Sequence, residues 1–224
     1  MIVISLGGSI IVPDKVDYDF LNSFKKVISK YTKKNKFVIV TGGGSTCRKY
    51  LKALEKKKFH VKIYSLIGIA TTKLNARVVA GFFKKTHEIP DTLKDVKKVL
   101  KKNNIAICGA LGYKPDMTTD GNAAEVAKYL KADLFVNLTN VKGLYNKDPS
   151  KYKNAKLIKK ISYQDFYDIA RKIKFKAGQH FVLDKVSAKI IKDSKIKTVI
   201  LNGRNLKNFE NCLKGKSFVG TTIF

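Results

Sequence analysis

Short hydrophobic runs alternate along the chain with longer stretches whose hydrophobic residues recur at helical spacing. The short runs predict buried β-strands at residues 2–6, 37–41, 105–108, 134–138 and 198–201. The longer stretches predict helices at residues 18–33, 45–58, 71–85, 92–102, 122–130, 163–172 and 183–192. This alternation predicts an α/β fold, a three-layer αβα sandwich in which helices cover both faces of a mostly parallel sheet.

No change of composition, Pro/Ser-rich linker or internal repeat divides the 224 residues, of which 44% are hydrophobic. That size suits one large domain, or two small lobes that share a core. We expect a single domain over residues 1–224. No run of about eighteen apolar residues occurs, and Met1 leads directly into the first predicted strand. We therefore expect a cytoplasmic protein with no membrane partner.

The strongest compositional signal is charge, with 46 Lys and Arg against 17 Asp and Glu and a formal net charge of +29. Such a balance is compatible with nucleic acid, a membrane surface or anionic small molecules as partners. Most of the excess is Lys spread through predicted helices such as residues 92–102, without interleaved aromatic residues or Arg clusters. We expect a solvated, lysine-rich surface with weak, salt-sensitive affinity for polyanions and no specific nucleic-acid partner.

Cysteine and histidine give no metal or disulfide pattern. The three cysteines are widely spaced, so we expect reduced thiols. The three histidines, His60, His87 and His180, follow no metal-ligand spacing, so we expect no metal site built by the protein itself.

Glycines follow the first two predicted strands, at the edge where open α/β sheets bind ligands. Residues 7–9 read Gly-Gly-Ser, a turn whose backbone N–H groups could approach an anion or could simply reverse the chain. Residues 42–44 are three glycines that open a helix carrying Arg48, which adds a positive dipole end and a two-pronged phosphate donor. Neither a Walker loop nor a dinucleotide fingerprint occurs, which argues against P-loop kinases and Rossmann dehydrogenases.

Two further junctions are polar. Residues 112–120 end in Thr118 and Thr119, whose hydroxyls could donate to a phosphate or ribose, and in Asp120, which could orient nearby cationic groups or accept a hydrogen bond from a substrate. These residue types could equally cap the helix that follows. Residues 139–149 follow a very apolar strand and, taken alone, are typical of a plain loop.

Taken in chain order, these four junctions resemble those of the amino-acid kinase family, and within it those of the archaeal uridylate kinases. Residues 67–69, Thr72, Asn75 and the tail 217–223 also match, so the resemblance covers essentially the whole chain. It implies a parallel sheet with the acceptor site in about residues 1–130 and the ATP site in about residues 131–224. It also implies ATP as phosphoryl donor, UMP as acceptor, Mg²⁺ carried with ATP, and a homo-oligomer, commonly a hexamer.

The resemblance assigns roles residue by residue. The group expected at the transferring phosphate is Gly7, Gly8, Ser9, Arg48, Asp120, Lys142 and Asp184. The group expected to bind ATP is Gly7, Gly8, Gly43, Arg48, Thr139, Asn140, Tyr145 and Asp148. The group expected to hold UMP is Gly42, Ser65, Tyr113, Lys114, Pro115, Asp116, Met117, Thr118 and Thr119.

Three positions depart from the family pattern. Ser5 stands where many members place a lysine, Ser65 where uridylate kinases usually place an aspartate, and Lys142 where an aspartate is often found. One hypothesis is that Lys142 replaces the positive charge absent at Ser5. The other is that Lys142 is a tolerated substitution whose side chain points into solvent. The alternatives for function are therefore a sister kinase such as an isopentenyl phosphate kinase, or a catalytically weakened nucleotide-binding homologue.

Overall fold

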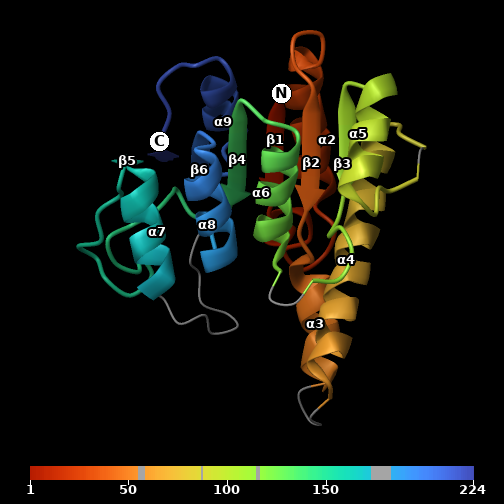
Figure 1. The fold of residues 1–224 in the computed structure, drawn as a ribbon, viewed down its shortest axis with the longest axis horizontal. Helices are drawn as coiled ribbons and strands as arrows, with labels where there is room; N and C mark the ends of the chain where they lie inside the picture. Colours follow the sequence, from red (N-terminus) through yellow and green to blue (C-terminus); the bar gives the residue numbers. More distant parts are fainter. Residues whose placement is uncertain (55–58, 87, 115–116, 173–182) are drawn as a thin grey trace.

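A seven-stranded sheet, in the order β3-β2-β1-β4-β6-β7-β5, organises the described residues (Figure 1). The structure is a computed structural model that describes residues 1–54, 59–86, 88–114, 117–172 and 183–224. The strands are β1 Ile2–Leu6, β2 Phe37–Thr41, β3 Ile105–Cys108, β4 Leu134–Thr139, β5 Lys160–Ile161, β6 Thr198–Asn202 and β7 Thr221–Ile223. Every pairing is parallel except that of β6 with β7. The predicted mostly parallel sheet is therefore confirmed.

The five predicted strands all form. β1, β2 and β3 have the predicted bounds, while β4 and β6 each extend one residue further, to Thr139 and Asn202. β5 and β7 were not predicted, because runs of two and three residues are too short to show an alternating or continuous apolar pattern.

The helices follow the predicted order with two additions and one large shift. They are α1 Gly8–Ile11, α2 Tyr18–Tyr31, α3 Gly44–Leu54, α4 Val61–Phe82, α5 Leu93–Lys102, α6 Thr119–Tyr129, α7 Tyr163–Lys172, α8 Lys185–Ser194 and α9 Leu206–Leu213. The short α1 and α9 were not predicted. The predicted start of a helix at residue 71 is wrong, since α4 begins ten residues earlier; residues 55–58 of another predicted helix lie outside the described residues.

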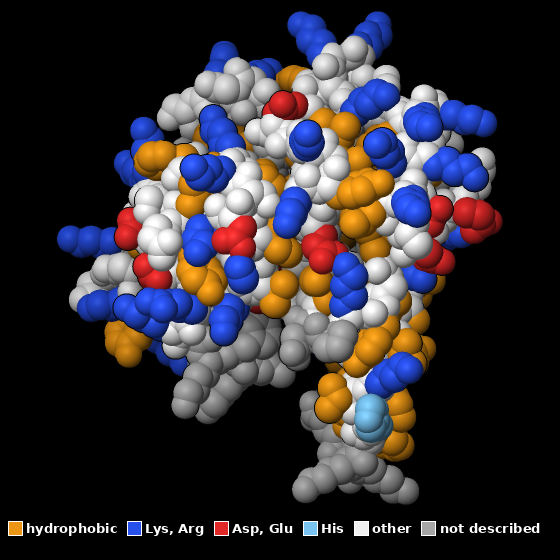
Figure 2. All heavy atoms as spheres, in the orientation of Figure 1, with side chains coloured by type: hydrophobic (Ala, Val, Ile, Leu, Met, Phe, Trp, Pro, Cys, Tyr) orange, Lys and Arg blue, Asp and Glu red, His pale blue; other side chains and the backbone are white. Residues whose placement is uncertain are grey.

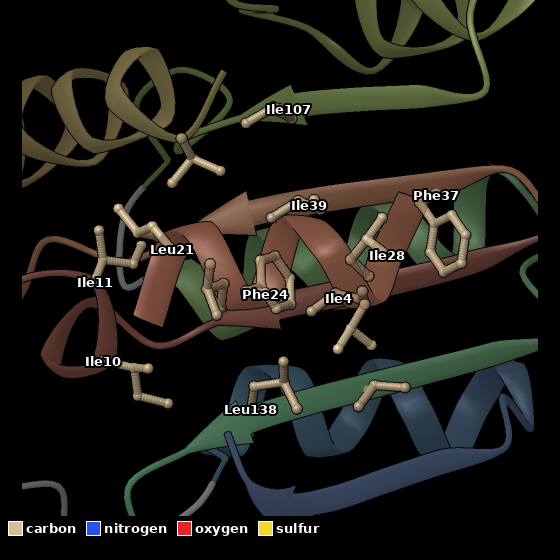
Figure 3. Packing of buried hydrophobic residues seen from close by; sticks show 14 of the residues in the cluster. Ile4, Ile10, Ile11, Leu21, Phe24, Ile28, Phe37, Ile39, Ile107 and Leu138 are labelled. Carbon is tan, nitrogen blue, oxygen red and sulfur yellow. The ribbon is translucent and has the colours of Figure 1, made fainter. Parts of the chain in front are cut away.

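Two hydrophobic layers hold these helices against the sheet. One packs α1, α2, α4 and α9 on one face, where Phe24 and Ile28 of α2 contact Ile4 and Ile39 of the strands (Figure 3). The other packs α5, α6, α7 and α8 on the opposite face, around Val3, Phe135 and Phe166. Strands covered on both faces explain why the predicted runs are continuously apolar.

The sheet order brings the important loops together. β1 lies between β2 and β4, so the loops that follow these parallel strands emerge at the same edge of the sheet. Helices α3 and α4 project beyond that edge (Figure 1). None of the described helices is both long and apolar enough to span a bilayer.

Polar side chains tie α4 to this edge. Asn75 donates from Nδ2 to the carbonyl oxygens of Gly42, at 2.7 Å, and Gly43, at 3.1 Å. Thr41 donates from Oγ1 to the Thr72 carbonyl at 2.8 Å. Because these groups are buried, the glycine loop after β2 is held by hydrogen bonds that water cannot readily replace.

We predict that Asn75→Ala lowers the free energy of unfolding by about 1 to 3 kcal/mol, since two carbonyl groups lose a buried partner. Urea titration measures this loss. Asn104→Ala is the matched control, because its amide also donates to one backbone carbonyl, that of Thr32, but is exposed. Equal losses in the two variants would contradict the proposed role of Asn75.

Candidate active site

At their closest approach, the loops after β1 and β2 touch through backbone atoms. A Cβ atom added to Gly8 would lie 2.1 Å from the Gly44 nitrogen and 2.6 Å from the Gly42 carbonyl carbon. Gly44 has φ +67°, a conformation that side-chain-bearing residues rarely adopt. The glycines predicted to approach a ligand are therefore required first for the approach of the two loops to each other.

This contact leaves backbone donors unused. Among the described residues, no acceptor takes the N–H of Gly8, Ser9, Gly43 or Gly44. Gly8 and Ser9 open α1, and Gly44 opens α3, so these donors lie at two helix N-termini. Converging N–H groups at helix N-termini favour bound anions, which makes this edge suited to phosphate groups.

Arg48 lies on α3, one turn after Gly44. Its side chain is exposed and forms no ion pair or hydrogen bond with any described residue. The guanidinium is thus available to an anion at the helix N-terminus, as a two-pronged donor.

A buried polar network lies next to the glycine loops. Ser5, buried in β1, donates from Oγ to Asp120 Oδ1 at 2.7 Å, which joins β1 to the first turn of α6. Thr118 donates to Asp184 Oδ2, and Asp184 Oδ1 accepts from the Val186 and Ser187 nitrogens at 2.7 and 2.9 Å. Asp184 therefore serves as the N-cap of α8.

The two carboxylates of this network influence each other. Burial raises the pKa of the Asp120 carboxyl to about 7; the hydrogen bond from Ser5 opposes this shift and the nearby charge of Asp184 adds to it. Since Ser5 brings no positive charge, Asp120 has only a neutral donor from β1. An anion bound at this edge would raise the pKa of Asp120 further, whereas a cation bound there would favour the ionised form.

The loop after β4 is fixed from the far end of the chain. Thr221 of β7 accepts from the Leu144 nitrogen at 2.8 Å and donates to the Ile158 carbonyl at 2.6 Å. Of the residues predicted to bind ATP, Thr139 and Tyr145 are half-buried, while Asn140 and Asp148 are exposed. Asp148 Oδ1 accepts from the nitrogen and hydroxyl of Ser150.

Lys142 is exposed on the same loop and forms no hydrogen bond or ion pair with another described residue. That Lys142 replaces the charge absent at Ser5 stays a prediction.

The residues predicted to hold UMP come from two segments. Ser65 lies in the projecting half of α4, and its hydroxyl contacts the Val61 carbonyl at 3.4 Å. Tyr113 and Lys114 follow β3, and Lys114 is ion-paired with Glu125 of α6 at 2.6 Å. The predicted residues Pro115 and Asp116 lie outside the described residues.

The remaining UMP candidates stand at the start of α6. Thr118 is the N-cap, accepting from the Gly121 nitrogen at 3.0 Å while donating to Asp184, so its hydroxyl is already engaged. The Thr119 hydroxyl bonds to no described residue, and Met117 is half-buried. Capping, one of the two roles considered for Thr118, is confirmed.

Other features do not compete with this site. Two cavities, of about 350 and 450 Å³, include Cys212 and Phe218 in one and Pro90 and Val99 in the other, and neither is lined by a predicted site residue. Within the described ranges no group of three His, Cys, Asp or Glu residues could hold a metal ion. His60 caps α4, the other two histidines lie outside those ranges, and the cysteines are free thiols.

Three contributors were not recognised as such from the sequence. Asn75 was noted only as part of a matching segment, although it holds the glycine loop. Ser5 was read as a departure, although it is the hydrogen-bond partner of Asp120. Thr221 lies 77 residues from the Leu144 it holds. No local pattern signals such long-range hydrogen bonds; a buried polar residue within an apolar strand, as at Ser5, is the one usable hint.

Comparison with known proteins agrees with the geometry. The profile of the amino acid kinase family matches residues 1–202. Uridylate kinase of Thermoplasma volcanium is 35% identical, covering 99% of this chain and 96% of its own, and that of Thermococcus onnurineus is 36% identical, covering 96% of each. The crystal structure of uridylate kinase from Archaeoglobus fulgidus is 32% identical with a TM-score of 0.87, covering 100% of this chain and 99% of that one.

The raised pKa of Asp120 predicts a pH-dependent stability. Between pH about 4 and 7 the folded state holds a proton that the unfolded state, with a carboxyl pKa of 3.8, has lost, so the free energy of unfolding falls as pH rises through this window. Asp120→Asn stays neutral and still accepts from Ser5. We expect it to be more stable than the parent at pH 8, by no more than about 4 kcal/mol, with the difference vanishing toward pH 4.

Thermal unfolding of both proteins at a series of pH values measures this difference. A variant no more stable than the parent at pH 8 would show that Asp120 is ionised there without cost.

Proposed function

The chain belongs to the amino acid kinase family, and we propose that it transfers the γ-phosphoryl group of ATP to UMP, in pyrimidine nucleotide biosynthesis. The observation that carries this proposal is the pair of glycine loops whose unused N–H groups converge at one edge of the sheet. Relatives named uridylate kinase match nearly the whole chain and therefore include that edge. The cytoplasm is the location that this substrate pair implies.

Direct transfer needs little covalent chemistry from the protein. The attacking oxygen belongs to the UMP phosphate, which is already an anion at neutral pH, so no strong general base is required. The chain's contribution is to orient two phosphate groups and to offset their charge. We propose that the N–H groups of Gly8, Ser9, Gly43 and Gly44, with Arg48, do this.

The two nucleotides would occupy opposite sides of the glycine loops. We propose that about residues 1–130 hold UMP, with Ser65 and Tyr113 on that side, and that about residues 131–224 hold ATP near Thr139 and Tyr145. Mg²⁺ would arrive bound to the ATP phosphates. Lys142, with no acidic partner among the described residues, would add positive charge that Ser5 does not supply.

The three departures from the family pattern, Ser5, Ser65 and Lys142, favour one second candidate, a nucleotide-binding homologue with weakened catalysis. It would bind ATP and UMP without releasing ADP. Phosphorylation of isopentenyl phosphate is the alternative activity within the family to compare with phosphorylation of UMP.

We also propose a homo-oligomer. Large apolar side chains are exposed on the projecting part of the molecule, where Figure 2 shows hydrophobic side chains gathered. Ile63, Leu66 and Leu74 form a stripe along α4 and are 39, 48 and 56% exposed. A second copy covering this stripe would remove it from water. Light scattering of the purified protein at a monomer mass would contradict this.

The function itself is tested by coupled ADP release with UMP, CMP, dTMP, isopentenyl phosphate and acetylglutamate as acceptors. We expect UMP to give the highest kcat/KM and turnover to require Mg²⁺. Higher turnover with isopentenyl phosphate or acetylglutamate would contradict the assignment of UMP as the phosphoryl acceptor. Binding of both nucleotides without ADP release would favour the weakened homologue.

Arg48 provides a residue-level test. Arg48→Ala should lower kcat/KM by about one to three orders of magnitude, because a phosphate-stabilising donor is lost, and Arg48→Lys should restore only part of it. Arg171→Ala is the control, since this exposed arginine pairs with Asp168 one turn earlier in α7 and is not among the residues proposed for the site. Unchanged kinetics in a folded Arg48→Ala variant would assign Arg48 to the solvated surface.

A further inference from the structure

One stripe of α4 faces the loop that follows β3. Lys62, Ser65, Ile69 and Thr72 are spaced three and four residues apart, so they share one side of the helix. At one end of the stripe, Thr72 Oγ1 accepts from the Ala110 nitrogen at 2.9 Å. At the other end, Lys62 Nζ lies 5.7 Å from the centre of the Tyr113 ring. The stripe is thus in contact with residues 110–113 at both ends, with Ser65 between them.

The charges along this contact are unevenly compensated. Lys114, next to Tyr113, is neutralised by Glu125 at 2.6 Å. Lys62 forms no ion pair with a described residue, and Ser65, one turn away on the same stripe, carries no charge. Lys62 is therefore a cation without an ion-pair partner among the described residues, and it lies against an aromatic ring that is 40% exposed.

We propose that Lys62 and Tyr113 bind the acceptor nucleotide together. The Tyr113 ring offers a face to the pyrimidine base, and the Lys62 ammonium donates a hydrogen bond to an oxygen of the same nucleotide. An aromatic face beside a cation suits a substrate that is flat, oxygen-rich and anionic, and suits an apolar prenyl chain poorly. This inference rests on the proposed function and assigns part of its acceptor specificity to Lys62.

Steady-state kinetics of Lys62→Met test the inference, because methionine retains an unbranched side chain and removes the charge. We expect the KM for UMP to rise about ten- to a hundredfold, as for loss of a charge-assisted hydrogen bond, while kcat and the KM for ATP change less than about twofold. Tyr113→Ala should also raise the KM for UMP, and the double variant should lose less than the product of the two effects, since the residues act on one ligand.

The matched control is Lys97→Ala. Lys97 of α5 lies over the Tyr129 ring at 5.9 Å, nearly the same contact, but joins α5 to the last residue of α6. It should leave the KM for UMP unchanged. Lys62→Arg, which keeps the charge, should retain most of the UMP affinity even if Lys62→Met folds poorly.

The outcomes separate this inference from the proposed function. An unchanged KM for UMP in Lys62→Met, or equal increases in the KM for UMP and for ATP, would overturn the role of Lys62 while leaving the kinase activity intact. A parent protein that releases no ADP with UMP would overturn the proposed function instead.

Discussion

The contact between the loops after β1 and β2 constrains everything else at this edge of the sheet. With Gly8 backed directly against the backbone of residues 42–44, no side chain fits between the loops. The same contact orients two helix N-termini into one region, where the N–H groups of Gly8, Ser9, Gly43 and Gly44 have no acceptor among the described residues. A structure that leaves such donors unsatisfied carries a free-energy cost unless water or an anionic ligand meets them. The anion-binding property thus follows from the packing of the two loops.

That packing is maintained from outside the loops. Asn75 of α4 holds the carbonyl groups of Gly42 and Gly43, so the N–H groups on the other side of those peptides remain directed away from α4. On the opposite flank, Ser5 and Asp120 tie β1 to α6. Burial raises the pKa of Asp120 to about 7, and the hydrogen bond from the neutral Ser5 hydroxyl offsets this only in part, so the ionisation of Asp120 would respond to the charge of the bound substrates.

Much of the fold could be predicted from the sequence, because buried parallel strands and glycine clusters are local signals. The strands 2–6, 37–41 and 105–108 were predicted with the bounds that the structure has. The first ten residues of α4 were missed for a physical reason: exposed Val61, Ile63 and Leu66 remove the polar face by which an amphipathic helix is recognised. β7 was missed because a three-residue strand carries no periodicity.

In the candidate site, too, some residues could be predicted from the local sequence and others could not. Gly8, Gly43 and Arg48 could be proposed from local residue types, since glycines and a helix N-terminus lie side by side in the sequence. The pairing of Ser5 with Asp120 spans 115 residues, and that of Lys62 with Tyr113 joins a helix to a distant loop. Such contacts depend on tertiary packing, which residue order alone does not specify.

We propose that phosphate groups bind the unused N–H groups of the two glycine loops. The most direct test of this proposal is amide NMR of the ¹⁵N-labelled protein during titration with a non-hydrolysable ATP analogue, Mg²⁺ and UMP. We expect the amide protons of Gly8, Ser9, Gly43 and Gly44 to move downfield on saturation, as amides do when they donate to an anion. Unmoved signals from all four residues, with both ligands bound, would contradict it.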